Sequence, residues 1–230
     1  RRQAHRMLAD EKVAGFVHGF PEAWLNLRDL GGMPPPRETA RVYYAENLPE
    51  AMKTEVRMFL LHLLREDGPV HHFLESDYTF ADKRLARLYN LPERETLRIA
   101  DGFKRVSLAG NRQRGGLLRH GSILTVTSYA TRTSPVIRGH WILANLAGAP
   151  PPPPPPDVPS LDANVVSASL PIRQRLAQHR ENPACASCHD VMDPVGFALE
   201  NFDAVGRWRT EEDHKTVDAS GGLADGSKFD

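Results

Sequence analysis

The sequence is poor in three features that would place it in a large class of proteins: charge of one sign, long apolar runs and cysteine. Its 29 basic residues balance 29 acidic residues, so no basic field exists to attract nucleic acid or an anionic membrane. No apolar run approaches the roughly 20 residues that span a bilayer. Its two cysteines allow one disulfide at most, and their CxxC spacing would make it a tight ring and a poor structural staple.

The chain also lacks a starting Met and a signal peptide. It opens on "RRQAHRMLADEKVAGF", which already reads as helix, and it stops on "LADGSKFD", which caps nothing. We therefore expect a segment of a longer protein, whose destination the missing signal peptide does not reveal. With 230 residues, 40% of them hydrophobic, the segment is long enough for one large domain or a few small ones.

Apolar residues at three- and four-residue steps predict amphipathic helices in the first ninety residues. One helix starts near Pro49, which suits a first turn. Another contains Pro21, which must kink or restart it, and a third ends at Asn90. We interpret the apolar stripes as helix-bundle core rather than as a cofactor site. The stripes are Phe16, Phe20, Trp24 and Leu27; Met52, Val56, Phe59, Leu60, Leu63 and Leu64; and Phe80, Leu85, Leu88 and Tyr89.

The middle of the chain has a different composition. Residues 93–134 are rich in glycine, serine, threonine and β-branched residues, which predicts loops with a few short strands. A helix is then predicted from Ser134, a capping residue, to Gly148, a stop signal. The seven prolines from Pro150 to Pro156 predict a polyproline II rod, which we interpret as a stiff linker.

Both cysteines lie in "ACASCHD", where His189 directly follows the second of them. CxxCH is the pattern of c-type haem attachment, with thioether bonds from Cys185 and Cys188 and with His189 as proximal iron ligand. A zinc site needs about four ligands, which His179, His189 or His214 would have to complete at irregular spacing. A redox pair would follow a strand in a βαβ unit, whereas the preceding segment is helical. The motif alone leaves haem, zinc and a redox or inert pair open.

Helical segments are predicted on both sides of the motif. "SLPIRQRLAQHREN" is a short amphipathic helix with Leu176 on its apolar face. After the motif, Asp193 and Pro194 are predicted as the N-cap and first turn of the next helix, which Gly206 stops.

Two long stretches carry a family resemblance. "RGGLLRHGSILTVTSYATRTSPVIRGHWILANLAGAPPPPPPPDVPSL" and "LAQHRENPACASCHDVMDPVGFALENFDAVGRWR" closely resemble the large multidomain planctomycete-type c-type cytochromes, which combine several modules of unknown function. "FLESDYTFADKRLARLYNL" looks like the end of the preceding module, and "VDASGGLADGSKFD" looks like the start of the following one. The resemblance implies one covalently attached haem c and export to the periplasm, the cell surface or the medium. It does not supply a reaction.

A second axial ligand is needed for a six-coordinate electron-transfer haem. We expect His120, in a loop-rich segment, to be the best candidate for this distal position. Met192 is only three residues from His189 and is expected to pack rather than bind iron, and His140 is a weaker candidate. The ligand can also lie outside this chain, or the iron can be five-coordinate. Four arginines are candidate partners of haem propionates: Arg112, Arg114, Arg132 and Arg138.

The sequence thus predicts a mainly α fold in five parts. These are a helical module at 1–92, a loop-rich segment with one helix at 93–149, the polyproline linker at 150–159, a small cytochrome c-like haem-bearing helical segment at 160–210 and the start of a following module at 211–230. We expect an electron-transfer module that serves a redox partner protein or domain, rather than a catalyst by itself. The alternatives are a peroxidase- or oxidase-like haem enzyme and a module in which haem mainly stabilises the fold.

Overall fold

The computed structural model describes residues 2–38, 40–92, 102–153, 170–212, 214–223 and 226–229. About half of the chain is helical and the strands are few and short, so the prediction of a mainly α fold is confirmed. The chain forms two compact units: unit 1 is Arg1–Thr133 with Phe202–Thr210, and unit 2 is Ser134–Asn201 with Glu211–Asp230. The domain boundaries predicted along the sequence stay predictions.

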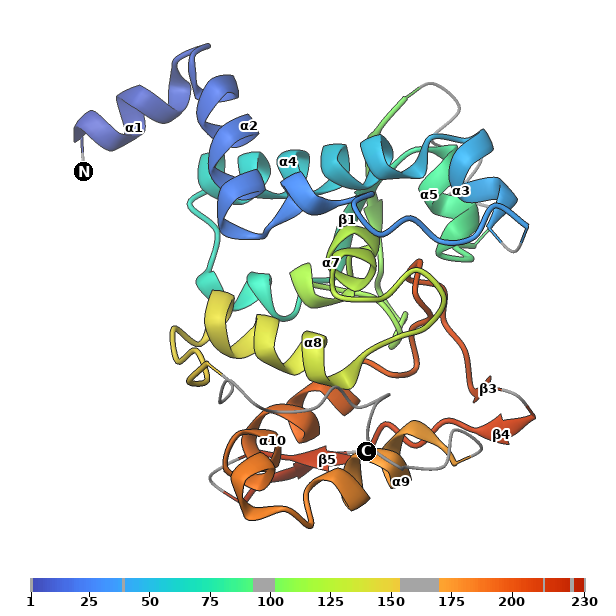
Figure 1. Cartoon of the computed structure of the whole chain (residues 1–230). Coiled ribbons are helices and arrows are strands. Elements are labelled where there is room, and N and C mark those ends of the chain that lie inside the picture. The colour runs from blue at the N-terminus through green and yellow to red at the C-terminus, as the bar shows by residue number, and fades with distance from the viewer. Residues whose placement is uncertain are drawn as a thin grey trace. The chain divides into compact units, whose positions relative to one another are not determined.

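Unit 1 is organised around the long helix α4 (Leu48–Arg65), which contacts α2 (Val13–Trp24), β1 (Tyr78–Ala81), α5 (Lys83–Leu88) and α7 (Gly121–Val126) (Figure 1). As predicted, α4 has a proline in its first turn and buries one apolar face that includes Met52, Val56 and Phe59. The remaining elements of unit 1 are α1 (Arg2–Ala9), η1 (Leu27–Asp29), α3 (Arg41–Ala45), η2 (Val70–Phe73), β2 (Lys104–Ser107) and η3 (Leu117–Arg119).

The predicted apolar stripe of Phe16, Phe20, Trp24 and Leu27 is wrong for its two phenylalanines, whereas Leu27 is fully buried as predicted. Phe16 and Phe20 are exposed and stack on each other at a ring distance of 5.1 Å. The buried residues of α2 are instead Val13, Val17 and Pro21. These three residues follow one another at four-residue steps, so the helix carries two apolar stripes and its neighbours select the smaller one.

Two other local predictions need correction. Residues 78–81 form β1 rather than helix, and β1 pairs antiparallel with β2, with Tyr78 opposite Ser107. The helix begins only after Asp82, whose carboxylate accepts the backbone N–H groups of two residues in the first turn of α5. The stretch 93–149 was predicted to hold one helix, but α7 is a second one. Its sequence GSILTV has weak helix propensity, and burial of its first five residues holds it in place.

Unit 2 contains α8 (Pro135–Trp141), the π-helical turn η4 (Ile142–Leu146), α9 (Ile172–His179) and α10 (Pro183–Phe197). Ser134 caps α8 as predicted, because its hydroxyl accepts the N–H of Ile137. The other elements of unit 2 are two short hairpins. One pairs β3 (Glu211–Glu212) with β4 (Lys215–Thr216), and the other pairs β5 (Gly221–Gly222) with β6 (Lys228–Phe229).

Two glycines let α8 and α10 cross in close backbone contact. A Cβ atom at Gly139 of α8 would lie 1.9 Å from the carbonyl oxygen of Met192. A Cβ atom at Gly196 of α10 would lie 1.8 Å from the carbonyl oxygen of Pro135. Neither site tolerates a side chain, so the crossing fixes α10 against α8.

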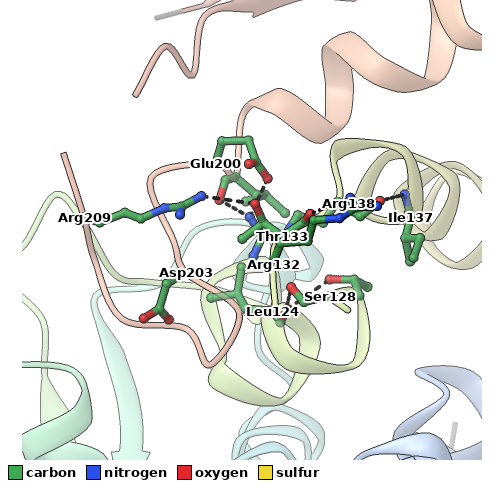
Figure 2. A network of polar contacts seen from close by, with 12 residues as sticks. Leu124, Ser128, Arg132, Thr133, Ile137, Arg138, Glu200, Asp203 and Arg209 are labelled. Atoms are coloured by element: carbon green, nitrogen blue, oxygen red, sulfur yellow. Dashed lines mark hydrogen bonds and ion pairs between the residues drawn. The ribbon is translucent and has the colours of Figure 1, made fainter. Parts of the chain in front are cut away.

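A buried ion pair fixes the same two helices. Arg138 of α8 is fully buried, and its guanidinium contacts Glu200 at 2.8 Å and donates to the carbonyl oxygen of Leu199 at 2.6 Å (Figure 2). Both partners lie just after the end of α10. A buried charge left without its partner is strongly destabilising, so this contact holds the C-terminal end of α10 in one position.

The polyproline prediction falls largely outside the described residues, which leave out 154–169. The described prolines Pro150–Pro153 form no helix or strand. Among the described helices, none is long and apolar enough to cross a membrane.

Candidate functional site

The CxxCH residues lie on α10. Asn182 caps this helix, because its side-chain oxygen accepts the N–H of Ala184 at 3.0 Å, and a proline follows in the first turn. Cys185 and Cys188 are half-buried free thiols. On a helix, residues three apart lie on the same face, so α10 presents both thiols on one side.

His189 is oriented by a carboxylate one helical turn further on. Its Nδ1 lies 2.9 Å from Oδ1 of Asp193, whose side chain is fully buried. An ionised carboxylate only accepts hydrogen bonds, so Nδ1 is the donor to Asp193 and Nε2 is the ring nitrogen left to face a metal. The side chain of His189 is 17% exposed, and this is the tautomer in which a histidine binds a metal through Nε2.

The prediction that Asp193 and Pro194 form the N-cap and first turn of a new helix is wrong. They do not start a new helix, because α10 continues through Pro194 to Phe197. The proline removes one backbone hydrogen bond, but the helix stays in place through its crossing with α8. The carboxylate of Asp193 is thereby free to hold His189 rather than to cap a helix.

Two residues of the segment before α10 complete the surroundings of His189. The ring of His179, at the end of α9, lies edge-on to the ring of His189 with a centroid distance of 4.8 Å. Burial lowers the pKa of His179, against the raising effect of the Asp193 carboxylate. Arg180 places its guanidinium 3.8 Å from Oδ2 of Asp193 and 3.7 Å from Oδ1 of Asp190.

Of these three neighbours of His189, the sequence suggests a role at the motif only for His179, as a candidate zinc ligand, and none for Asp193 or Arg180. A signal for Asp193 was present, because side chains four residues apart on a helix are neighbours. No local pattern shows the other two, since α9 and α10 are brought together by folding.

Met192 lies at the crossing of α8 and α10 and is buried, next to Gly139. This position agrees with the expectation that it packs inside the fold. His140 is exposed on α8.

His120 belongs to unit 1, where it precedes α7. Its side chain is 2% exposed and packs edge-on against Phe59 at a ring distance of 5.0 Å. Neither ring nitrogen has a hydrogen-bond partner among the described residues. Burial lowers the pKa of His120 to about 3, so the ring is neutral. These contacts give His120 a structural role within unit 1. Its assignment as distal ligand stays a prediction.

The nearest carboxylate to His120 is used elsewhere. Oε1 of Glu55 lies 3.9 Å from Nε2 of His120, but Glu55 accepts hydrogen bonds from the hydroxyls of Thr79 and Tyr89. Burial raises the pKa of Glu55 to about 7, against the lowering effect of these two hydrogen bonds. Tyr89 in turn accepts the backbone N–H of Gly121 at 2.8 Å.

Three of the four arginines considered for haem propionates have partners inside their own unit. Arg114 of unit 1 stacks on the ring of Tyr89 and donates to the carbonyl oxygens of Arg119 and Gly206. Arg138 of unit 2 holds the buried pair with Glu200. The third, Arg132 of unit 1, lies over the ring of Tyr129. A propionate role for any of the four stays a prediction.

The residues of α10 fit a c-type haem. Two thiols three residues apart on one helical face are followed by an imidazole whose Nδ1 proton is already held. The zinc alternative gains no support, because the described residues contain no group of three or more His, Cys, Asp or Glu side chains that could hold a metal ion.

Comparison with known families finds two domains in the chain. Residues 1–91 match the family described as PSD4, protein of unknown function (DUF1592), and residues 114–212 match PSCyt3, protein of unknown function (DUF1588). Both are planctomycete cytochrome-associated modules, and the second match contains the CxxCH motif. No curated protein and no solved structure matches the chain.

Proposed function

We propose that the chain is a covalent haem c module that transfers electrons within or from a larger exported protein. One observation carries this proposal: CxxCH lies on a single helix, and Nδ1 of its histidine lies within hydrogen-bond distance of a buried carboxylate. Two matched domains of a cytochrome-associated type support it.

The residues of α10 have defined tasks in this proposal. The thiols of Cys185 and Cys188 would hold the haem through two thioether bonds, one to each of its vinyl-derived carbons. His189 would bind the iron through Nε2, and Asp193 holds its Nδ1. The bound haem supplies a one-electron ferric–ferrous couple. The Gly139–Gly196 crossing keeps α10 in place during that exchange.

Export and a redox partner are parts of the same proposal. They rest on the resemblance to exported c-type cytochromes, since c-type haem is attached outside the cytoplasmic membrane. The electron-carrier role is favoured over a haem enzyme because the sequence shows no distal acid–base pair.

The test is the behaviour of the chain after production in a host with the c-type maturation machinery. We expect a ferric haem that is low-spin, does not bind cyanide or CO and cycles reversibly between its two states. A high-spin iron that binds both ligands readily would instead support the oxidoreductase alternative. A haem that cannot be cycled would support a purely structural role.

A further inference from the structure

The most unusual charge in unit 2 is the carboxylate of Asp193. It lies in the middle of α10 with no exposed surface, and only one of its oxygens has a hydrogen bond, from Nδ1 of His189 at 2.9 Å. The second oxygen has no hydrogen-bond partner among the described residues, and the nearest cation, Arg180, is 3.8 Å away. Burying a carboxylate with so few partners is costly, so its position calls for a role.

We propose that Asp193 is a positioning residue that fixes the tautomer of His189 and lowers the midpoint potential of the haem. This inference rests on the proposed function. A carboxylate that accepts the outer N–H of a metal-bound histidine orients the ring and makes it a more basic ligand. A more basic ligand favours ferric over ferrous iron, so the module gives up its electron more readily than one whose histidine bonds to a neutral acceptor.

The neighbours of Asp193 leave its carboxylate directed at His189. Arg180 is beyond hydrogen-bond distance of Oδ2 and is shared with Asp190 at 3.7 Å. From α9, the ring of His179 lies edge-on to the ring of His189 at a centroid distance of 4.8 Å. Asp193 therefore has one long ion pair, with Arg180 at 3.8 Å, and its closest contact is the hydrogen bond to the histidine at 2.9 Å.

The chain offers a matched control for this residue. Asp190 is near the same arginine and is also on α10, but it is 66% exposed and is not bonded to His189. Asp193→Asn and Asp190→Asn therefore remove the same charge close to the same site. Only the first changes the acceptor of the histidine N–H, so a difference between the two variants isolates that contact.

The experiment measures the midpoint potential of the holoprotein by spectroelectrochemistry. Asp193→Asn is expected to shift the ferric–ferrous equilibrium at least tenfold toward ferrous, which is about 59 mV for a one-electron couple. Asp190→Asn is expected to shift it less than threefold because solvent screens its charge. Asp193→Glu keeps the charge and is expected to stay within threefold of the wild type. Equal shifts in the two Asn variants, or no shift in Asp193→Asn, would overturn the inference.

If Asp193→Asn does not fold, the wild-type holoprotein still tests whether Asp193 accepts the proton on Nδ1 of His189. The proton on Nδ1 of His189 is expected to give a strongly downfield NMR signal in the reduced state and to exchange slowly, since its acceptor is buried. A signal at the position of a solvent-bonded imidazole would overturn the inference. Absence of covalent haem in the wild type would contradict the proposed function instead, so the two failures are distinguishable.

Discussion

His120 in unit 1 and His189 in unit 2 each lie near a fully buried carboxylate, but the two carboxylates are used differently. Glu55 accepts from Thr79 and Tyr89 and leaves His120 without a hydrogen bond. Asp193 accepts from His189 itself. A buried carboxylate thus prepares a histidine for metal binding only where its lone pairs are directed at that ring. Of the two pairs, Asp193 with His189 has this arrangement and Glu55 with His120 does not.

The largest effect is expected from closing the helix crossing that places His189. Gly139→Ala or Gly196→Ala would put a Cβ atom within 2 Å of a backbone carbonyl oxygen, which no rotamer change relieves. We expect a loss of more than about 3 kcal/mol in the stability of unit 2, together with loss of covalent haem. Thermal unfolding and haem staining of the variants measure both effects.

The matched control is Gly19→Ala on α2 of unit 1, where an added Cβ atom meets nothing within 4 Å. Alanine is expected to stabilise that helix by about 0.5–1 kcal/mol. If the substitutions at the crossing were as harmless as this one, the two helices of unit 2 would not be fixed as described.

The next effect concerns the pH dependence of unit 1. The pKa of Glu55 is raised to about 7, so the folded unit holds a proton that the unfolded chain releases. Its contribution to stability is complete below pH 4.5 and is lost as the pH rises to 7. His120 acts oppositely: its pKa is lowered to about 3, so stability is lost as the pH falls from 6.5 to 3.

Removing Glu55 should leave the pH dependence of stability that is due to His120. Relative to the wild type, Glu55→Gln is expected to gain about 3 kcal/mol as the pH rises from 4.5 to 7. Urea unfolding at each pH, followed by methyl NMR signals of α4, measures this difference. A difference independent of pH would show that Glu55 is not held protonated by burial.

The smallest effect on stability is expected from His120→Phe. Phenylalanine fills similar space and removes two buried nitrogens without partners, so a gain of about 1 kcal/mol is expected. The ferric haem spectrum of the same variant tests the prediction that His120 is the distal ligand, and an unchanged low-spin spectrum would eliminate it. A change of the ferric haem from low to high spin would establish His120 as the distal ligand instead.

The sequence predicts the elements that depend on local chemistry. The first turn at Pro49 and the cap at Ser134 are found where expected, and Asn90 adopts the left-handed conformation of a helix stop. These features need only the residues next to them in the chain, as does the helical spacing of Cys185 and Cys188.

The predictions that fail depend on tertiary contacts. Phe16 looks like a core residue, but the partners of α2 select its opposite face. Helix α7 exists because its residues are buried and because Tyr89 bonds to its first N–H group. Asp193 has the sequence context of a cap, yet α10 extends through it, and the resulting contact with His189 becomes visible only in three dimensions.

The most direct test of the account is intact and peptide mass spectrometry of the chain after maturation in a c-type cytochrome host. The account predicts one haem per chain that survives acid denaturation and is found on the peptide containing Cys185 and Cys188. A Cys185→Ala, Cys188→Ala double variant should lack it. A wild-type chain that emerges with the mass of unmodified protein, while a control cytochrome from the same cells is fully loaded, would contradict the account.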